Sequence, residues 1–181
     1  LADRNAYFGG ITDAPEILDP FTGERRPCTE EDVRATVRLI DALPEMYFTN
    51  TAGLVSDRPA EVGALVSMAH CLIGTPKPVV TAPVATEVVV ASHEMAAIAV
   101  GGAEVLRDHP LLIVYAEPVS PLVHSDEGLE KLLYCAEHRI PLVYTGYAAQ
   151  GGTAPMSTAG NVVQLSAESL SGLVIHQLKQ P

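Results

Sequence analysis

Apolar residues along this chain form two kinds of pattern that alternate. Short runs without charge are typical of strands that are buried on both faces, whereas apolar residues that recur three or four positions apart predict helices. The runs lie at 46–51, 78–82, 111–116 and 140–145, and the helical stretches lie at 59–73, 87–106, 126–138 and 159–178. Four strands that are each followed by a helix predict right-handed crossovers and a parallel sheet.

The first part of the chain carries turn signals in place of a long periodic pattern. Residues 10–28 place a proline and glycine turn at 20–23 between two short extended stretches, which predicts a small β-hairpin. Thr29 is followed by three acidic residues and then by apolar residues at helical spacing. Such a residue caps the free N–H groups of a first turn, so a helix is predicted from here to Leu43.

The repeated strand and helix units favour a TIM (β/α)8 barrel, of which this chain covers a part. A complete barrel typically contains about 250 residues, and the chain has 181. We therefore expect residues 1–181 to form one partial barrel domain, in which the hairpin at 10–28 precedes the strand and helix units. A doubly wound sheet is the alternative, although the phosphate-binding GxGxxG pattern is missing after the first strand.

Charge and composition argue against several classes of protein. The 22 acidic and 11 basic residues give a formal charge of -11, which would repel a nucleic acid backbone. The apolar runs are shorter than the roughly 18 residues that a bilayer crossing needs, so no membrane association is expected. Cys28, Cys71 and Cys135 lack CxxC or histidine spacing, so neither a disulfide framework nor a metal site is expected. These features predict a cytoplasmic protein.

In a barrel the chemistry lies at the carboxyl ends of the strands. Glu117 directly follows the run at 111–116 and is therefore the predicted catalytic residue. The alternative is that Glu117 pairs with a neighbouring group and holds the rim together. His124 lies seven residues further on, where it either returns toward Glu117 or caps the helix that starts near Ser125.

Two aromatic residues mark the end of the last predicted strand: Tyr144 lies within it and Tyr147 just beyond it. Aromatic faces beside a carboxylate suit a methylated ammonium, which donates no strong hydrogen bond and is held by charge and cation–π attraction. Neighbouring strands stand only about 5 Å apart, so we expect Tyr144, Tyr147 and Glu117 to converge on one concave site. The alternative for Tyr144 is that its ring packs against the sheet.

Three sequence motifs resemble one known family. These are YAEPVSPLVH at 115–124, GGTAPMSTAG at 151–160 and ILDPFTGERRP at 17–27, and their order and spacing also agree. The chain resembles the trimethylamine and quaternary amine corrinoid methyltransferases over nearly its whole length.

The resemblance implies an enzyme of methylamine metabolism with a TIM barrel fold. Such an enzyme moves a methyl group from a methylated amine to the Co(I) of a corrinoid (cobalamin) that a separate partner protein carries. The trimethylamine enzymes of this family contain pyrrolysine, and none is present in this sequence. This favours the quaternary amine branch, which includes the glycine betaine enzymes.

A quaternary substrate would give Glu117 the task of holding the cation, because the amine product leaves already neutral. The carboxylate of a betaine would be received by His124, Gln150 or the backbone at Gly151 and Gly152. We also expect the open edges of a partial barrel to be covered by a second copy or by chain outside this sequence.

Two other functions are alternatives to the methyltransferase. A noncatalytic remnant of the same barrel could bind an amine or assemble with a partner, and this alternative stays open. A lyase or aldolase would need a lysine nucleophile or a metal cluster at the strand ends. Lys77, Lys131 and Lys179 all lie before strands or within helices, so this alternative is set aside.

Overall fold

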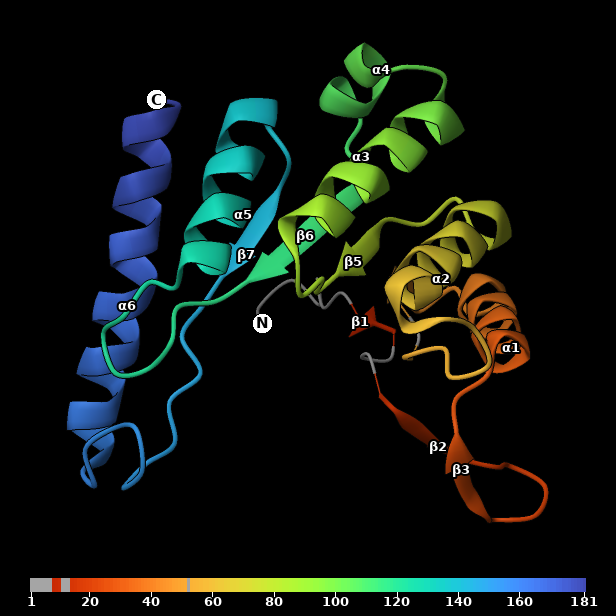
Figure 1. The fold of residues 1–181 in the computed structure, drawn as a ribbon, viewed down its shortest axis with the longest axis horizontal. Coiled ribbons are helices and arrows are strands. Elements are labelled where there is room, and N and C mark those ends of the chain that lie inside the picture. Colours follow the sequence, from red (N-terminus) through yellow and green to blue (C-terminus); the bar gives the residue numbers. More distant parts are fainter. Residues whose placement is uncertain (1–7, 11–13, 52) are drawn as a thin grey trace. The chain divides into compact units, whose positions relative to one another are not determined.

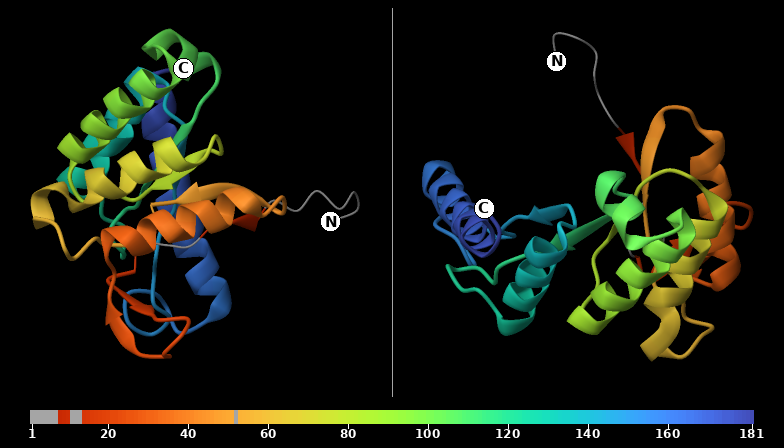
Figure 2. Two further views of the ribbon diagram at one scale, coloured as in Figure 1. Left: turned by 90° about the vertical axis from the view of Figure 1, so that its right-hand side faces the viewer. Right: turned by 90° about the horizontal axis from the view of Figure 1, so that it is seen from above.

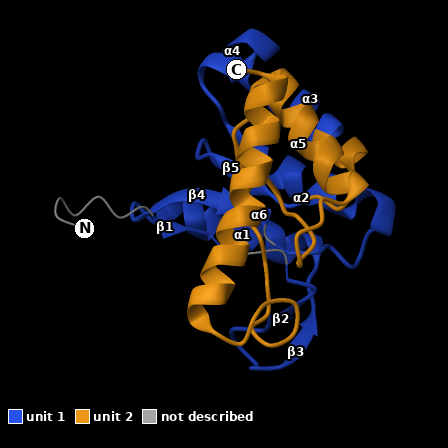
Figure 3. Cartoon of the chain, turned by 90° about the vertical axis from the view of Figure 1, so that its left-hand side faces the viewer, with its two compact units in different colours: residues 1–82, 90–113 blue, residues 83–89, 114–181 orange. Residues whose placement is uncertain are grey.

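The computed structural model describes residues 8–10, 14–51 and 53–181. They fall into two compact units, one within residues 1–82 and 90–113 and the other formed by residues 83–89 and 114–181 (Figure 3). None of the helices in the described part of the chain is long and apolar enough to span a membrane.

The first unit contains parallel strands in the order β1, β4, β5 (Figure 1). β4 pairs with β5 so that Thr49 lies opposite Val79, which confirms the parallel arrangement predicted for the first two apolar runs. β1 lies in a stretch where only turn signals were recognised, because two residues are too few to produce a pattern. The strands are β1 (Phe8–Gly9), β4 (Met46–Asn50) and β5 (Val79–Thr81), and the helices are α1 (Glu30–Ala42) and α2 (Ala60–Gly74).

The predicted hairpin is formed by β2 (Glu16–Leu18) and β3 (Arg25–Pro27), which pair antiparallel. Its turn is held by the carboxylate of Asp19, which accepts hydrogen bonds from the backbone N–H groups of Phe21 and Thr22 at 2.9 and 3.0 Å. The hairpin prediction is confirmed for the described residues, and residues 11–13 lie outside them.

Arg26 connects this hairpin to the start of α1. Its guanidinium donates two hydrogen bonds to Asp32, at 2.6 and 2.8 Å, and also pairs with Asp19. Asp32 in turn accepts a hydrogen bond from the Thr29 N–H at 2.8 Å, which satisfies one free donor of the helix start. The hydrogen bonds from Arg26 hold the pKa of the Asp32 carboxyl well below its ordinary value. The N-cap predicted at Thr29 is therefore part of a charged cluster.

The helix predicted at 87–106 is wrong in one respect, because it is two helices. α3 (Thr86–Val100) ends before Gly101 and Gly102, and α4 (Ala103–Asp108) follows them. The two glycines have φ angles of 91° and 147°, which side chains rarely allow. The apolar spacing continued across this break, so the period alone did not reveal it.

The second unit contains two parallel strands and two long helices. β6 and β7 pair so that Val114 lies opposite Leu142 and Ala116 opposite Tyr144, which confirms the parallel prediction for this pair. α5 and α6 pack against each other, and both contact β7 (Figures 1 and 2). The elements are β6 (Leu112–Ala116), which begins two residues before this unit, α5 (Asp126–His138), β7 (Leu142–Tyr144) and α6 (Thr158–Lys179).

Each long helix of this unit begins at a serine that caps it. The Ser125 hydroxyl accepts from the Gly128 N–H and the Ser157 hydroxyl accepts from the Gly160 N–H, each at 3.1 Å. The described residues form a mixed α/β protein in which parallel strands alternate with helices, as predicted.

Replacing Asp32 with Ala should lower the free energy of unfolding by about 2 kcal/mol, because Thr29 and Arg26 both lose a charged hydrogen-bond partner. The folded pKa of Asp32 is depressed, so its contribution is present above the ordinary value of 3.8 and is lost as the pH falls below it. Urea unfolding at pH 7 and at low pH measures both effects.

Glu31 provides the control, because it makes only exposed ion pairs with Arg34 and Arg38 on the same helix. Glu31→Ala should change the unfolding free energy little. Equal losses for Asp32→Ala and Glu31→Ala would contradict the role assigned to the Asp32 cluster.

Candidate functional site

The candidate site lies in the second unit, where β6 and β7 end. Side chains alternate between the two faces of a strand, and residues in register on neighbouring strands share a face. Ala116 and Tyr144 are in register, so they share one face. Tyr115 and Glu117 belong to the other face of the β6 strand. Two different sets of polar groups are formed in this way.

The first set centres on Tyr115. Its hydroxyl donates a hydrogen bond of 2.7 Å to Oε2 of Glu117, two residues further along the same face. Burial, together with the smaller effects of Glu117 and the nearby Tyr147, raises the pKa of the Tyr115 phenol to about 12. Glu117 is exposed, and Tyr147 is 81% exposed. Glu117 and Tyr147 therefore both lie near the phenol of Tyr115.

Tyr115 was not among the residues singled out from the sequence. It is the first residue of the YAEPVSPLVH motif and lies two positions before Glu117. The signal that could have found it is the period of two in a strand, which places residues 115 and 117 on the same face.

Tyr144 does not join the group formed by Tyr115, Glu117 and Tyr147. Its ring packs on Gly172 of α6, where a side chain would overlap the ring atoms. Its hydroxyl lies 2.7 Å from Nδ1 of His124. The expectation that Tyr144 converges with Glu117 is therefore corrected, because Tyr144 occupies the face of β7 that α6 covers. The surroundings of Tyr144 agree better with the alternative that its ring has a packing role, although the ring packs on α6.

His124 is held between β7 and α6. Its Nδ1 lies against the Tyr144 hydroxyl, and its Nε2 lies 2.9 Å from the hydroxyl of Ser171. The two rings also stack, with centroids 5.8 Å apart. Ser125 supplies the cap of α5, so His124 does not have the capping role that was the alternative. Both nitrogens of the His124 ring have partners within the protein.

A buried carboxylate that the sequence analysis missed lies beside these residues. Glu168 of α6 is 2% exposed and accepts three hydrogen bonds. The donors are the Ser120 hydroxyl at 2.8 Å, the Leu122 N–H at 2.9 Å and the Gln164 amide at 3.0 Å. Burial acts to raise the pKa of Glu168, but these hydrogen bonds and the nearby His124 outweigh it and lower the pKa.

One sequence signal could have pointed to Glu168. The helical stretch at 159–178 contains a single acidic residue and is otherwise uncharged. An isolated acid in a long apolar helix is either exposed or paired with a specific partner. Two of its three partners lie more than 40 positions away, so the sequence pattern could not supply them.

The loop after β7 closes on itself around the glycine pair. The Gln150 amide donates to the carbonyl oxygen of Met156, and Gly151 has a φ of 79°. A side chain at Gly151 would overlap the Met156 sulfur. Gln150 is therefore engaged within its own loop, and the binding roles expected of Gln150, Gly151 and Gly152 stay predictions.

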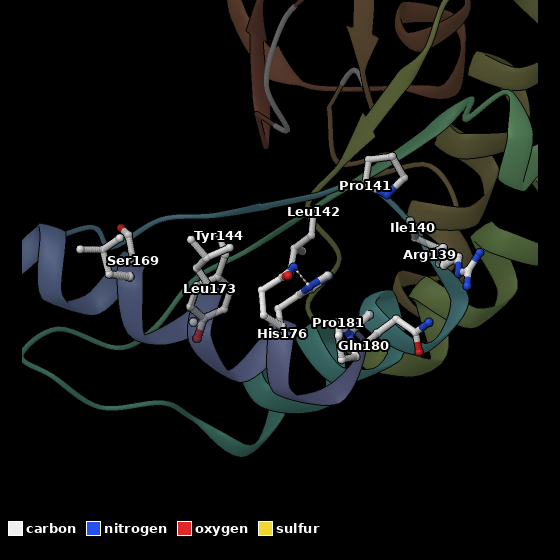
Figure 4. A pocket seen from close by; sticks show the side chains of 14 residues that line it. Arg139, Ile140, Pro141, Leu142, Tyr144, Ser169, Leu173, His176, Gln180 and Pro181 are labelled. Atoms are coloured by element: carbon white, nitrogen blue, oxygen red, sulfur yellow. Dashed lines mark hydrogen bonds between the residues drawn. The ribbon is translucent and has the colours of Figure 1, made fainter.

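A separate hollow of about 690 Å³ opens between β7, α6 and the turn before β7 (Figure 4). Arg139, Ile140 and Pro141 lie where β7 begins, and His176 comes from the last turns of α6. Of the predicted site residues only Tyr144 lines it. The hollow runs along β7 from Pro141 to Tyr144, and Tyr147 is not among its lining residues.

Polar residues also gather where β4 and β5 end in the first unit. Thr49, Thr51 and Thr81 are buried there. The side-chain oxygen Oδ1 of Asn50 and the Thr51 hydroxyl have no hydrogen-bond partner among the described residues. Within the same described residues, no group of three or more His, Cys, Asp or Glu side chains is arranged to hold a metal ion.

Comparison with known proteins decides the family. The family model described as "Trimethylamine methyltransferase (MTTB)" matches residues 1–181. The chain belongs to this methyltransferase family. The resemblance expected from the three motifs is thereby confirmed.

Two bacterial relatives match almost the whole chain. The trimethylamine methyltransferase MttB of Desulfitobacterium hafniense strain DSM 10664 / DCB-2 is 28% identical over 98% of this chain, which covers 36% of that protein. The glycine betaine methyltransferase of strain Y51 is 27% identical over 99% of this chain, which covers 39% of that protein. The chain thus spans somewhat more than a third of the length of these relatives.

An archaeal member of the family matches a shorter part. The trimethylamine methyltransferase MttB of Methanosarcina barkeri strain Fusaro is 35% identical over 81 residues, which are 45% of this chain and 16% of that protein. The relatives thus include methyltransferases named for a tertiary amine and one named for a quaternary amine.

The geometry around Tyr115 predicts an unusual titration in this family member. Tyr115 should ionise with a midpoint of about 12. Glu117→Gln should lower this midpoint without bringing it to 10, because burial is the largest cause. The absorbance near 295 nm, taken as the difference between the unchanged protein and Tyr115→Phe, isolates this phenol.

The sign for stability follows from the raised pKa. The neutral phenol is favoured in the folded state, so its contribution is present below pH 10 and is lost as the pH rises from 10 to about 12. A Tyr115 midpoint at the ordinary value of 10 would contradict the burial of this phenol, and a midpoint that Glu117→Gln leaves unchanged would contradict the placement of Glu117 beside it.

Proposed function

We propose that this chain is part of a TIM barrel methyltransferase that transfers a methyl group from a quaternary amine to the Co(I) of a corrinoid. A separate partner protein carries the corrinoid, which serves as the acceptor substrate. Parallel strands followed by helices, and membership of the methyltransferase family, support the fold and the reaction class. Because the relatives are longer, the proposal concerns the whole protein.

The observation that carries this proposal is the group around Tyr115. An exposed carboxylate stands at the carboxyl end of a parallel strand, accepts a hydrogen bond from the Tyr115 phenol, and shares that phenol's surroundings with Tyr147. A quaternary ammonium has no N–H to donate, so it is bound by charge and by aromatic faces. Glu117 would supply the charge, and Tyr147, whose side chain is exposed, would supply an aromatic face.

The reaction requires no proton from the protein. The Co(I) electron pair forms the new bond to the methyl carbon, while the electron pair of the broken C–N bond returns to nitrogen. A quaternary amine therefore leaves as a neutral tertiary amine. The contribution of the barrel is to bind the substrate and orient one methyl group toward the acceptor.

This charge balance defines what Glu117 would do. The positive charge on nitrogen diminishes as the methyl group leaves, so a nearby carboxylate stabilises the substrate at least as well as the transition state. Such an interaction lowers KM without raising kcat. Glu117 would then be a residue of substrate binding and not a proton donor.

His124 and the glycine pair have a weaker claim on the substrate. Both ring nitrogens of His124 already have partners. A betaine carboxylate would have to replace the Tyr144 or Ser171 hydroxyl at this ring, or bind the backbone at Gly151 and Gly152. In this proposal the glycine pair is the better receptor, since its loop lies nearer in sequence to Tyr147.

The whole protein with Glu117→Gln should show a raised KM for glycine betaine and a nearly unchanged kcat. Tyr147→Ala should also weaken binding, by about 0.5 to 2 kcal/mol for the loss of one aromatic face. Tyr147→Phe retains the ring and is the matched control. Initial rates measured from the change in corrinoid absorbance give KM and kcat separately.

The same measurement separates the alternatives. A neutral isostere of the amine should bind equally well to the unchanged protein and to Glu117→Gln. A protein that binds the amine but never changes the corrinoid spectrum would support the noncatalytic alternative. A fall in kcat with unchanged KM for Glu117→Gln would overturn the binding role.

A further inference from the structure

The buried carboxylate of Glu168 has no role in the proposed function described so far. It lies in the middle of α6 and is almost fully enclosed. Its three hydrogen-bond donors include a hydroxyl and a backbone N–H from the loop that follows β6. A helix residue therefore holds the loop in which the family motif continues after Glu117.

The part of the loop that Glu168 holds has an unfavourable backbone. Leu122 has a φ of 59°, in the left-handed region that side chains disfavour. The same residue donates its N–H to Glu168. Two backbone hydrogen bonds between Val119 and Val123, at 2.7 and 3.0 Å, close the turn around it. The contact with Glu168 thus stabilises a conformation that Leu122 would not adopt by itself.

Glu168 also touches the loop that follows β7. A side chain at Gly146 would overlap Oε2 of Glu168, so the backbone there lies directly against the carboxylate. The Gly146 N–H points to the Ser169 hydroxyl at 3.4 Å. Tyr147 is the next residue in the chain. One carboxylate therefore lies against both loops that carry the proposed cation-binding residues.

We propose that Glu168 is a positioning residue, which fixes the loops after β6 and β7 and thereby sets Glu117 and Tyr147 at the spacing that a quaternary ammonium requires. The binding part of this inference rests on the proposed function. The fixing of the loops does not, and it can be measured separately.

The first variant is Glu168→Gln, which retains the size of the side chain. The glutamine amide has one acceptor oxygen where the carboxylate has two, and its NH2 group is a donor. This NH2 group would face the donors of Ser120 or Leu122, so one of the present hydrogen bonds is lost. Hydrogen exchange of peptides that cover 117–124 should become faster. The affinity for tetramethylammonium, measured by calorimetry, should fall about tenfold, since small displacements of binding groups are costly.

Glu137→Gln is the matched control. Glu137 is an exposed acid on α5 that pairs with Lys179. The same change of charge at this position should leave both the exchange of 117–124 and the affinity for tetramethylammonium unchanged. An equal effect of Glu137→Gln would mean that net charge, and not positioning, is responsible, and would overturn the inference.

Leu122→Gly provides a rescue that a general loss of stability would not show. Glycine adopts a φ of 59° without strain, so in the Glu168→Gln background it should restore part of the tetramethylammonium affinity. If Glu168→Gln does not fold, Ser120→Ala removes one donor and should give a smaller change of the same kind.

The outcomes separate the two proposals. If the unchanged protein does not bind tetramethylammonium, the proposed function fails, while the exchange of 117–124 still tests the fixing of the loop. Unchanged exchange in both Glu168→Gln and Ser120→Ala would overturn the positioning role. Faster exchange with unchanged affinity, in a protein that binds the cation, would overturn it as well.

Discussion

The arrangement of the second unit depends on one buried anion. The Glu168 carboxylate is removed from water, which is unfavourable unless hydrogen bonds replace its hydration. Three donors do so, and two of them belong to the loop after β6. Because the buried anion needs these donors, movement of the loop away from α6 would leave the Glu168 charge without two of its hydrogen bonds. The same constraint holds the Leu122 backbone in its disfavoured conformation.

The second constraint is the alternation of side chains along β6 and β7. It sends Tyr115 and Glu117 to one face and Tyr144 to the other, where α6 and His124 receive it. Polar residues that are close in sequence therefore have different tasks. Those against α6 hold the structure together, whereas Glu117 and Tyr147 stay exposed. This separation leaves a carboxylate and an aromatic side chain accessible to a ligand on a rigid support.

Family membership gives these exposed groups a chemical context. The relatives are named for trimethylamine and for glycine betaine, two methylated amines that differ in whether nitrogen carries a fourth carbon. For the proposed quaternary substrate, binding needs charge and aromatic surface, and no proton donor is required. A site built from Glu117, Tyr115 and Tyr147 meets that need. The chain spans somewhat more than a third of each relative, so other parts of a binding site can come from the remaining length.

The sequence by itself determined the elements whose cause is local. The uncharged runs predicted parallel strands, Thr29 and its acids predicted a helix start, and the turn at 20–23 predicted a hairpin. The break at Gly101 was missed because apolar spacing continued across it. Only the tertiary structure decided which face Tyr144 takes and which groups surround Glu168. The two partners from the loop after β6 lie 46 and 48 residues from Glu168. A periodic pattern records the direction of a side chain relative to its own element, not the distant group that packs against it.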